Sequence, residues 1–233
     1  MYKLDRYWHG LLHILFPQRC AGCDTVLIHQ EHILCSTCLY HLPQTDHHKD
    51  TENETAKQLW GKVKFQYAAS MLTLSKSSRV QRIIHQLKYD QQPEIGIYLG
   101  KMYGEILLEN PIVDRVDVIV PIPIHSIKKR KRGYNQSEYF AIGLSEALNI
   151  PFDTTCLKRT VNSVSQTRKS RIDRYDNVEN AFAFVPQTGG KQTPNHVLLV
   201  DDVITTGATI AAAAQQLIDG LGCTVSIVTI ARA

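Results

Sequence analysis

The chain has 233 residues, enough for one large domain or for a principal domain with an appendage. Hydrophobic residues make up 43% and charged residues 21%, which is ordinary for a globular protein with a sizeable core. The formal net charge of +4 does not by itself predict a nucleic-acid partner, and no run approaches the roughly 18 apolar residues that a membrane-spanning helix needs.

The first residues, MYKLDRYWHGLLHILF, predict a short amphipathic helix that ends near Pro17, because apolar side chains recur at helical spacing. Two histidines and a glycine interrupt the apolar patch, and no small-residue cleavage site follows, so the segment is a poor match to a signal peptide. We expect its apolar stripe to pack in the core rather than to bind a membrane. Without an export signal, we expect a cytoplasmic protein whose six cysteines favour metal binding over disulfides.

Four cysteines form two Cys-x-x-Cys pairs, Cys20 with Cys23 and Cys35 with Cys38, separated by eleven residues. Each pair can turn two thiolates toward one point, and two pairs complete a tetrahedron around Zn²⁺. A redox pair or incidental buried thiols are the alternatives, and a doubled pair favours the metal. We therefore predict a structural zinc site that stabilises a segment too small to hold its own core.

Apolar residues nearly vanish between 43 and 58, which predicts a linker or a solvated loop. The chain is therefore expected to divide in two. Residues 1–58 would hold the N-terminal helix, the zinc ribbon and the linker, and residues 59–233 the principal domain.

Strand-like and helix-like segments alternate beyond this stretch. Short runs rich in β-branched residues predict strands at 64–74, 116–124, 181–186, 196–200 and 224–232. Helical spacing predicts helices at 77–90, with Ser77 or Ser78 as a cap, and at 94–110, 134–150 and 209–220. This alternation predicts an α/β fold, with a mostly parallel sheet flanked by helices.

The segment VLLVDDVITTGAT places two carboxylates at the end of an expected strand, followed by a turn that enters a helix. The first turn of a helix has free amides and a positive dipole end, which suit a phosphate, and Gly207 lets the backbone approach closely. Asp201 and Asp202 would repel that phosphate, so we expect them to accept hydrogen bonds from adjacent sugar hydroxyls. The segment thus predicts a sugar phosphate as ligand, and an ordinary strand-to-helix turn with threonine caps is the alternative.

The stretch KKRKR, at 128–132, puts five cations just past the end of an apolar strand. A magnesium diphosphate is a suitable counter-charge, because arginine can bind it with two parallel hydrogen bonds. A solvated basic turn and a groove for single-stranded nucleic acid are the alternatives, with Tyr134 and Tyr139 as stacking faces in the second case.

Several segments together resemble one known family. VLLVDDVITTGAT is similar to the phosphoribosyl pyrophosphate (PRPP) signature of type I phosphoribosyltransferases. DVIVPIPIHSIKKRKRGYNQSE, LKRTVNSVSQTRKSRIDRYDNVENAFAF and the paired cysteines resemble the ComF family, whose members include competence-associated proteins. The resemblance implies a type I phosphoribosyltransferase-like core with a small N-terminal zinc ribbon.

Carried onto this sequence, the resemblance implies that Asp201 and Asp202 contact the ribose 2′- and 3′-hydroxyls and indirectly support Mg²⁺. The residues implied around the 5′-phosphate are Thr205, Thr206, Gly207, Ala208 and Thr209. Those implied in the pyrophosphate loop and its basic continuation are Pro121, Ile122, Pro123, Lys128, Arg130, Arg132 and Gly133. A hood over the substrate would span 159–177 and include Gln166, Asn177 and the catalytic candidate Arg171.

The activity that follows from the resemblance is transfer of the phosphoribosyl group to a nitrogenous acceptor, with release of pyrophosphate. Positioned charge stabilises such a reaction more than a protein nucleophile does. The alternative is a binding module that handles single-stranded DNA, without catalysis or under the control of PRPP. The family's association with DNA uptake also implies a helicase partner.

Overall fold

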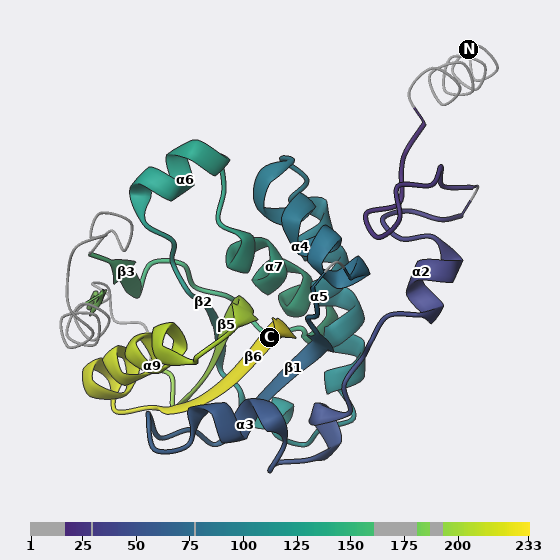
Figure 1. Cartoon of the computed structure of the whole chain (residues 1–233). Helices are drawn as coiled ribbons and strands as arrows, with labels where there is room; N and C mark the ends of the chain where they lie inside the picture. The colour runs from purple at the N-terminus through teal and green to yellow at the C-terminus, as the bar shows by residue number, and fades with distance from the viewer. Residues whose placement is uncertain (1–16, 29, 77, 161–180, 187–192) are drawn as a thin grey trace, which may run out of the picture.

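A four-stranded parallel sheet forms the centre of the computed structural model (Figure 1). Its strands are β1 (Tyr67–Thr73), β2 (Val118–Pro121), β5 (His196–Ile204) and β6 (Thr224–Arg232), in the order β1-β6-β5-β2. The structure describes residues 17–28, 30–76, 78–160, 181–186 and 193–233. The expected N-terminal helix and the hood residues Gln166, Arg171 and Asn177 lie outside these ranges.

Helices cover both faces of the sheet. One face packs against α4 (Arg79–Tyr89), α5 (Glu94–Leu107) and α7 (Gln136–Leu148), and the other against α3 (Glu54–Leu59) and α9 (Ala208–Leu221). The short antiparallel pair β3 (Leu157–Arg159) and β4 (Phe182–Phe184) joins the α9 side. The mostly parallel sheet flanked by helices is therefore confirmed. Within the described ranges, no helix combines the length and apolar character that crossing a bilayer requires.

The predicted elements form for the reasons that their patterns indicate. Ser78 caps α4 by accepting a hydrogen bond from the backbone N–H of Gln81, and the apolar residues of α4 are buried on one side. Helices α5 and α7 approach closely because glycines face each other. A Cβ atom added at Gly143 would clash with the carbonyl oxygen of Ile97, and one at Gly100 with that of Phe140.

Parts of the segment 43–58 pack against the sheet. The prediction of a linker or a solvated loop is wrong for 53–58, which begin α3, whereas residues 49–52 are exposed. The backbone N–H of Thr45 donates to the carbonyl oxygen of Met71 at 2.9 Å. Asn53 is 5% exposed and donates from Nδ2 to the carbonyl oxygen of Ala68 at 2.7 Å. Two of the buried side chains, Asn53 and Thr55, are polar and have specific partners, which a search for apolar residues does not detect. The division of the chain at residue 58 stays a prediction.

The basic stretch adds an element that the sequence did not predict. Lys128 to Arg132 lie in the helix α6 (Ser126–Arg132), which ends at Gly133 in a left-handed conformation with φ of 86°. Figure 1 shows α6 above the ends of β2 and β5. The five cations are therefore distributed around a helix rather than along a turn.

The cysteine pairs form a small unit at the opposite side of α4 from α6 (Figure 1). It contains the short helix α2 (Ser36–Tyr40) and a bridge between Arg19 and Val26. Arg82 of α4 donates from Nη1 to the carbonyl oxygen of Gly22 at 3.0 Å, which connects this unit to the helical layer.

Candidate functional site

The two carboxylates lie within β5 rather than beyond its end. The sequence predicted a strand at 196–200, but β5 continues to Ile204, and Asp201 is paired in register with Thr229 of β6. Pairing with the long neighbour β6 keeps the backbone extended through the polar residues, which hydropathy does not show. Asp201 and Asp202 are therefore held by the sheet itself, at the carboxyl edge where parallel α/β sheets bind ligands.

Asp201 is a partly buried carboxyl group with two hydrogen bonds. Ser137 of α7 donates from Oγ to Oδ1 at 2.8 Å, and the backbone N–H of Asp202 donates to the same atom at 2.9 Å. Burial raises the pKa of Asp201 to about 7, and the adjacent Asp202 carboxylate adds to this shift. A carboxyl group with this pKa exchanges its proton near neutral pH.

Asp202 forms an ion pair with Lys88 of α4, with 3.0 Å between Oδ2 and Nζ. Both side chains are largely shielded from solvent, at 14% and 22% exposure, so this pair is less screened than a surface salt bridge. The sequence analysis did not identify Lys88, because nothing in its neighbourhood distinguishes it from any other helical lysine. Lys88 can be recognised as a site residue only from its distance to Asp202 in the folded structure.

The predicted phosphate loop is a tight turn between β5 and α9. The turn covers 205–207, and α9 begins at Ala208 after Gly207, whose φ is 78°. Within the described part of the chain, the backbone N–H groups of Thr206 and Gly207 have no hydrogen-bond acceptor. The predicted residues 205–209 are thus placed at the start of a helix of 14 residues, beside the acidic pair.

The predicted pyrophosphate loop lies next to β5. The backbone N–H of Ile122 donates to the carbonyl oxygen of Val200 at 2.9 Å, which places the loop beside Asp201. Pro121 and Ile122 are buried and Pro123 is partly exposed. Asn135 donates from Nδ2 to the carbonyl oxygen of Ile122 at 3.0 Å, so the start of α7 supports this loop.

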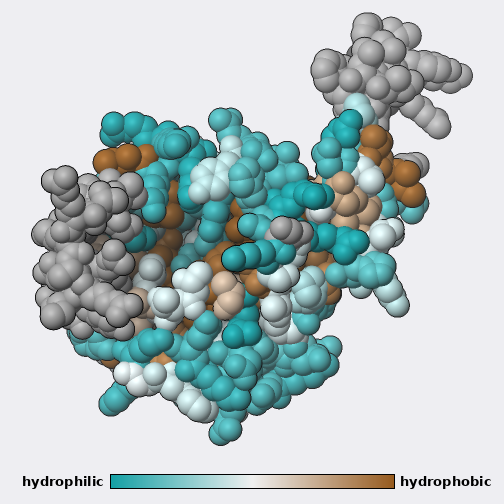
Figure 2. All heavy atoms as spheres, viewed as in Figure 1, coloured by the Kyte–Doolittle hydropathy of each residue, from teal (hydrophilic) through white to brown (hydrophobic). Residues whose placement is uncertain are grey.

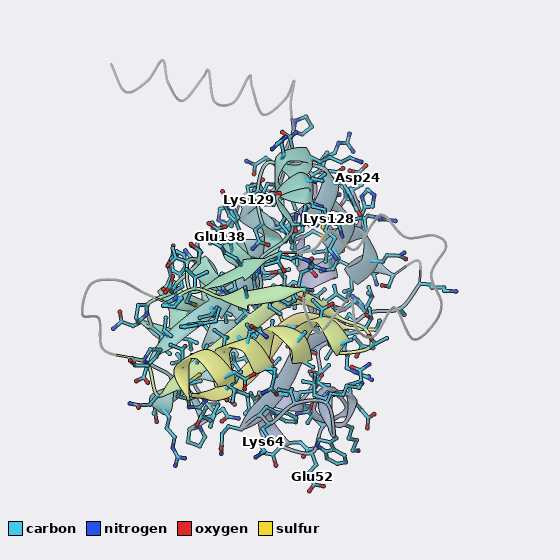
Figure 3. All side chains as sticks on the ribbon, turned by 90° about the vertical axis from the view of Figure 1, so that its left-hand side faces the viewer. Asp24, Glu52, Lys64, Lys128, Lys129 and Glu138 are labelled. Atoms are coloured by element: carbon cyan, nitrogen blue, oxygen red, sulfur yellow. The ribbon has the colours of Figure 1, made fainter. Side chains whose placement is uncertain are left out.

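Helix α6 holds two of its predicted cations, Lys128 and Arg132, in partly buried positions. Burial lowers the pKa of the Lys128 ammonium, and the nearby Arg159 and Arg132 lower it further. The Arg132 guanidinium lies 5.1 Å from the centre of the Tyr89 ring and donates to Oε1 of Gln136 at 2.8 Å. Arg130 is exposed. Lys129 pairs with Glu138 at 3.4 Å, and Figure 3 shows both at the outer surface.

Arg159 is a further cation near the acidic pair, and the sequence analysis placed it only at the start of the hood. Its guanidinium lies 5.1 Å from the centre of the Phe182 ring, so β4 holds it in place. Burial lowers its pKa, and the attraction of Asp201 opposes that shift. We call Lys88, Lys128, Arg132 and Arg159 the site cations. They come from three different elements, and Figure 2 shows hydrophilic residues over α6 and α4 above a hollow at this edge.

One predicted stacking face is absent from this surface. Tyr134 is 8% exposed, and its hydroxyl donates to the carbonyl oxygen of Leu87 at 2.5 Å. Tyr139 is partly buried against it. The prediction that Tyr134 offers a stacking face is therefore wrong, because its ring fills the space between α7 and α4. Tyr89, which is 56% exposed, is the open ring near α6.

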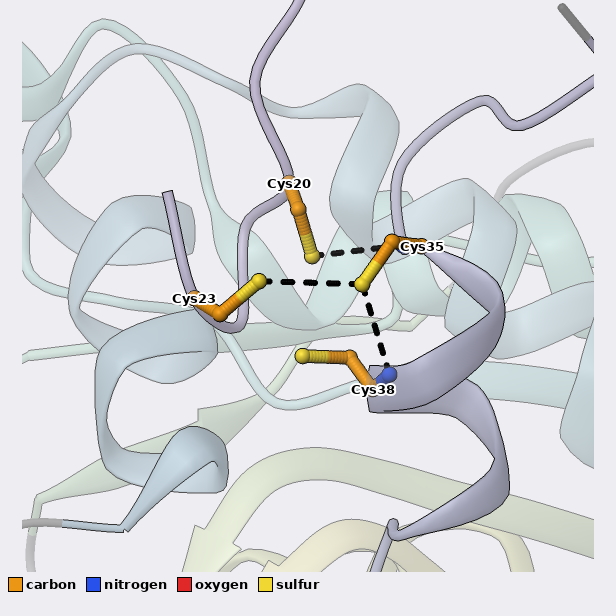
Figure 4. Close-up of side chains that lie close together, drawn as sticks. All are labelled: Cys20, Cys23, Cys35 and Cys38. Atoms are coloured by element: carbon orange, nitrogen blue, oxygen red, sulfur yellow. Dashed lines mark hydrogen bonds between the residues drawn. The ribbon is translucent and has the colours of Figure 1, made fainter. Parts of the chain in front are cut away.

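The four paired cysteines converge on one point (Figure 4). Their Sγ atoms all lie within 4.8 Å of one another, and those of Cys23 and Cys35 are 3.6 Å apart. The backbone N–H groups of Cys35 and Gly22 point to Sγ of Cys20, at 3.2 and 3.4 Å. This cluster could hold a metal ion, because thiolates are strong ligands and backbone N–H groups stabilise their charge.

A groove of about 570 Å³ lies between the cysteine unit, the end of α4 and the start of α5. Its lining residues carry both signs of charge, among them Arg19, Asp24 and Glu94. None of the predicted site residues lines it. Its position therefore does not support a role in the chemistry at the carboxyl edge of the sheet.

No family model matches the chain. It is 32% identical over 156 residues to the DNA utilization protein YhgH of Escherichia coli O157:H7, which covers 64% of this chain and 66% of that protein, just under two thirds of its length. It is 37% identical over 95 residues to competence protein F of Haemophilus influenzae, covering 40% of this chain and 41% of the other.

A solved structure of a glutamine PRPP amidotransferase from B. subtilis, in complex with ADP and GMP, is 22% identical. It covers 63% of this chain and 30% of that one, with a TM-score of 0.41. The predicted resemblance to ComF-type proteins rests on the sequence relatives.

The raised pKa of Asp201 predicts a pH-dependent stability. The folded protein holds this proton up to about pH 7, whereas an unperturbed aspartate has a pKa of 3.8. The stability that the proton contributes is therefore present below about pH 4 and is lost as pH rises toward 7. Asp201→Asn removes the buried charge. We expect its melting temperature at pH 8 to exceed that of the wild type by roughly 4–8 °C, for about 2 kcal/mol.

Thermal denaturation followed by circular dichroism at pH 5 and pH 8 tests this expectation. The difference between Asp201→Asn and wild type should shrink at pH 5, where the wild-type carboxyl is mostly protonated. The exposed Asp114→Asn serves as a matched control. A difference that is the same at both pH values would contradict the buried, proton-holding state of Asp201.

Proposed function

Because the chain has homologues among the YhgH and competence F proteins, we propose that it binds PRPP with Mg²⁺ and transfers the phosphoribosyl group to a nitrogenous acceptor. The observation that carries this proposal is the composition of the carboxyl edge of the sheet. An acidic pair, a turn with free amides and the site cations lie together there. PRPP has a diol that can donate hydrogen bonds to the acidic pair, a terminal phosphate that suits the free amides, and a pyrophosphate whose negative charge suits the site cations.

The acidic pair suits the ribose diol. The Asp202 side chain, paired with Lys88, has oxygen atoms that can accept hydrogen bonds from hydroxyl groups. Asp201 already accepts one from Ser137, which orients its carboxyl group. Two acceptors fixed by the sheet would hold the sugar in one orientation. This lowers the entropy that has to be lost to orient the sugar for the reaction.

The site cations suit the leaving group. In the proposed reaction a C1–N bond forms, the C1–O bond to pyrophosphate breaks, and the electron pair leaves with pyrophosphate while the acceptor nitrogen loses its proton. Lys128, Arg132 and Arg159 would bind the charge that develops on the leaving oxygens. Bound Mg²⁺ would supply further neutralisation of that charge.

Titration calorimetry with PRPP and Mg²⁺ tests the binding. We expect one exothermic binding site, and Lys128→Met should weaken PRPP binding roughly tenfold because the pyrophosphate group loses a partly buried cation that balances its charge. Lys131→Met, an exposed change on the same helix, should bind like the wild type. Absence of any heat with the wild type would contradict the proposal.

Release of pyrophosphate in the presence of a panel of bases and amines separates transfer from binding. If the wild type binds PRPP but releases no pyrophosphate above background, the proposed binding site stands and catalysis with those acceptors is excluded.

A second candidate function is the binding of single-stranded DNA, and the arrangement around Tyr89 favours it. The exposed ring of Tyr89 lies under Arg132, next to the exposed cations of α6. Base stacking on aromatic rings combined with a basic surface is how proteins hold single strands. The names of the relatives, DNA utilization protein and competence protein F, refer to DNA and are compatible with this candidate.

Fluorescence anisotropy with a labelled oligonucleotide at increasing salt tests this candidate. The logarithm of the affinity should fall linearly with the logarithm of the salt concentration, because phosphate contacts release counterions. Tyr89→Ala should weaken binding roughly tenfold through lost stacking. Tyr40→Ala, an exposed tyrosine on the cysteine unit, is the control. Weak binding that is insensitive to salt would exclude this function.

For the cysteine cluster we propose a structural zinc ion. Four thiolates at about 2.3 Å from a tetrahedral ion are roughly 3.8 Å apart, close to the 3.6 Å between the sulfurs of Cys23 and Cys35. A set of four cysteines leaves no ligand position open for a substrate. The ion would hold residues 20–38 together, since few apolar side chains are buried within that unit.

Elemental analysis of the purified protein should find about one zinc per chain. Cys38→Ser should lose the metal and lower the melting temperature, and a chelator should do the same to the wild type. Cys223→Ala changes a buried cysteine outside the cluster and should keep the metal. A wild type without zinc, or a metal content unchanged in Cys38→Ser, would disprove the assignment.

A further inference from the structure

The turn after β5 receives two hydrogen bonds from a part of the chain that lies far away in sequence. Gln58 of α3 donates from Nε2 to the carbonyl oxygen of Thr205 at 2.7 Å. Lys62, just beyond α3, donates from Nζ to the carbonyl oxygen of Thr206 at 2.6 Å. Lys62 also donates to the carbonyl oxygen of Gln58 at 2.6 Å, so the two donors form one connected group.

These bonds fix the direction of two backbone N–H groups. In a planar trans peptide the N–H points opposite to the C=O. Holding the carbonyl of Thr205 toward Gln58 therefore turns the N–H of Thr206 away from α3, and holding the carbonyl of Thr206 toward Lys62 does the same for Gly207. Both amides are left without an acceptor within the described residues, on the side where a phosphate would lie.

Close packing adds to the hydrogen bonds. Gly207 has a φ of 78°, and a Cβ atom built there would lie 3.0 Å from Cδ2 of Leu59 and 3.3 Å from the carbonyl oxygen of Gln58. The end of α3 therefore lies directly against the turn. A cation that binds a peptide carbonyl also polarises that peptide, which makes its N–H a stronger donor.

We infer that Gln58 and Lys62 are positioning residues for the terminal phosphate of the substrate. They act through the carbonyls of Thr205 and Thr206, which present the amides of Thr206 and Gly207 to the anion. This inference rests on the proposed function of the turn as a phosphate site. It extends that site to the segment before residue 63, which the sequence analysis assigned partly to a linker.

The experiment compares two ligands that report on separate parts of the site. Ribose 5-phosphate carries the terminal phosphate and lacks the pyrophosphate, whereas inorganic pyrophosphate is expected to bind at the site cations. Titration calorimetry of both ligands is carried out with the full chain as wild type, Lys62→Met, Lys62→Arg and Lys64→Met. Lys64 is an exposed lysine two residues further on, at the surface in Figure 3, and serves as the matched control.

We expect Lys62→Met to weaken the binding of ribose 5-phosphate roughly five- to tenfold, because the variant loses a charged hydrogen bond that orients a backbone donor. Lys62→Arg keeps its donors and should restore most of the affinity, and Lys64→Met should match the wild type. The affinity for pyrophosphate should be the same in all four proteins.

Three outcomes would overturn the inference in different ways. If Lys62→Met binds ribose 5-phosphate as well as the wild type does, the positioning role fails while the phosphate site stands. If both ligands weaken equally, Lys62 supports the structure in general and does not orient the turn. If the wild type binds neither ligand, the proposed function fails and the inference falls with it.

Discussion

The side-by-side placement of two carboxylates at the end of a buried strand is the constraint that organises this edge of the molecule. Like charges on neighbouring residues repel, and burial increases the cost. Each of the two carboxyl groups is stabilised by a side chain from a different helix. Ser137 of α7 donates to Asp201, while Lys88 of α4 neutralises Asp202. Through these two contacts, α7 and α4, which lie in the same helical layer, are both attached to the carboxyl edge of the sheet. The turn after β5 and helix α6 lie at the same edge.

The segments with a repeating pattern were predictable from the sequence. Runs of β-branched residues indicated β1, β2, β5 and β6, and helical spacing indicated α4, α5, α7 and α9. The acidic pair and the turn after it were identifiable because their residues are consecutive. Arg159 of β3 and Lys88 of α4 also lie near the acidic pair. Each is a single residue with no accompanying sequence motif, so the sequence alone does not identify it.

The basic stretch shows why a local motif can be recognised while its geometry is not. Five consecutive cations look equivalent in the sequence. In a helix, Lys128 and Arg132 are four residues apart and lie on one side, where both are partly buried, while Arg130 is exposed. The burial of Asn53 was missed for a related reason, because it depends on hydrogen bonds to particular partners such as Ala68.

The strand order has a consequence for how the protein is made. β6 lies between β1 and β5, so neither of these two strands has its inner neighbour until residues 224–232 have been synthesised. Before that point the nascent chain carries unpaired apolar strand edges, which are sites of intermolecular association. The nine-residue strand β6 therefore joins β1 on one side to β5 and β2 on the other, and the sheet is complete only once it has formed.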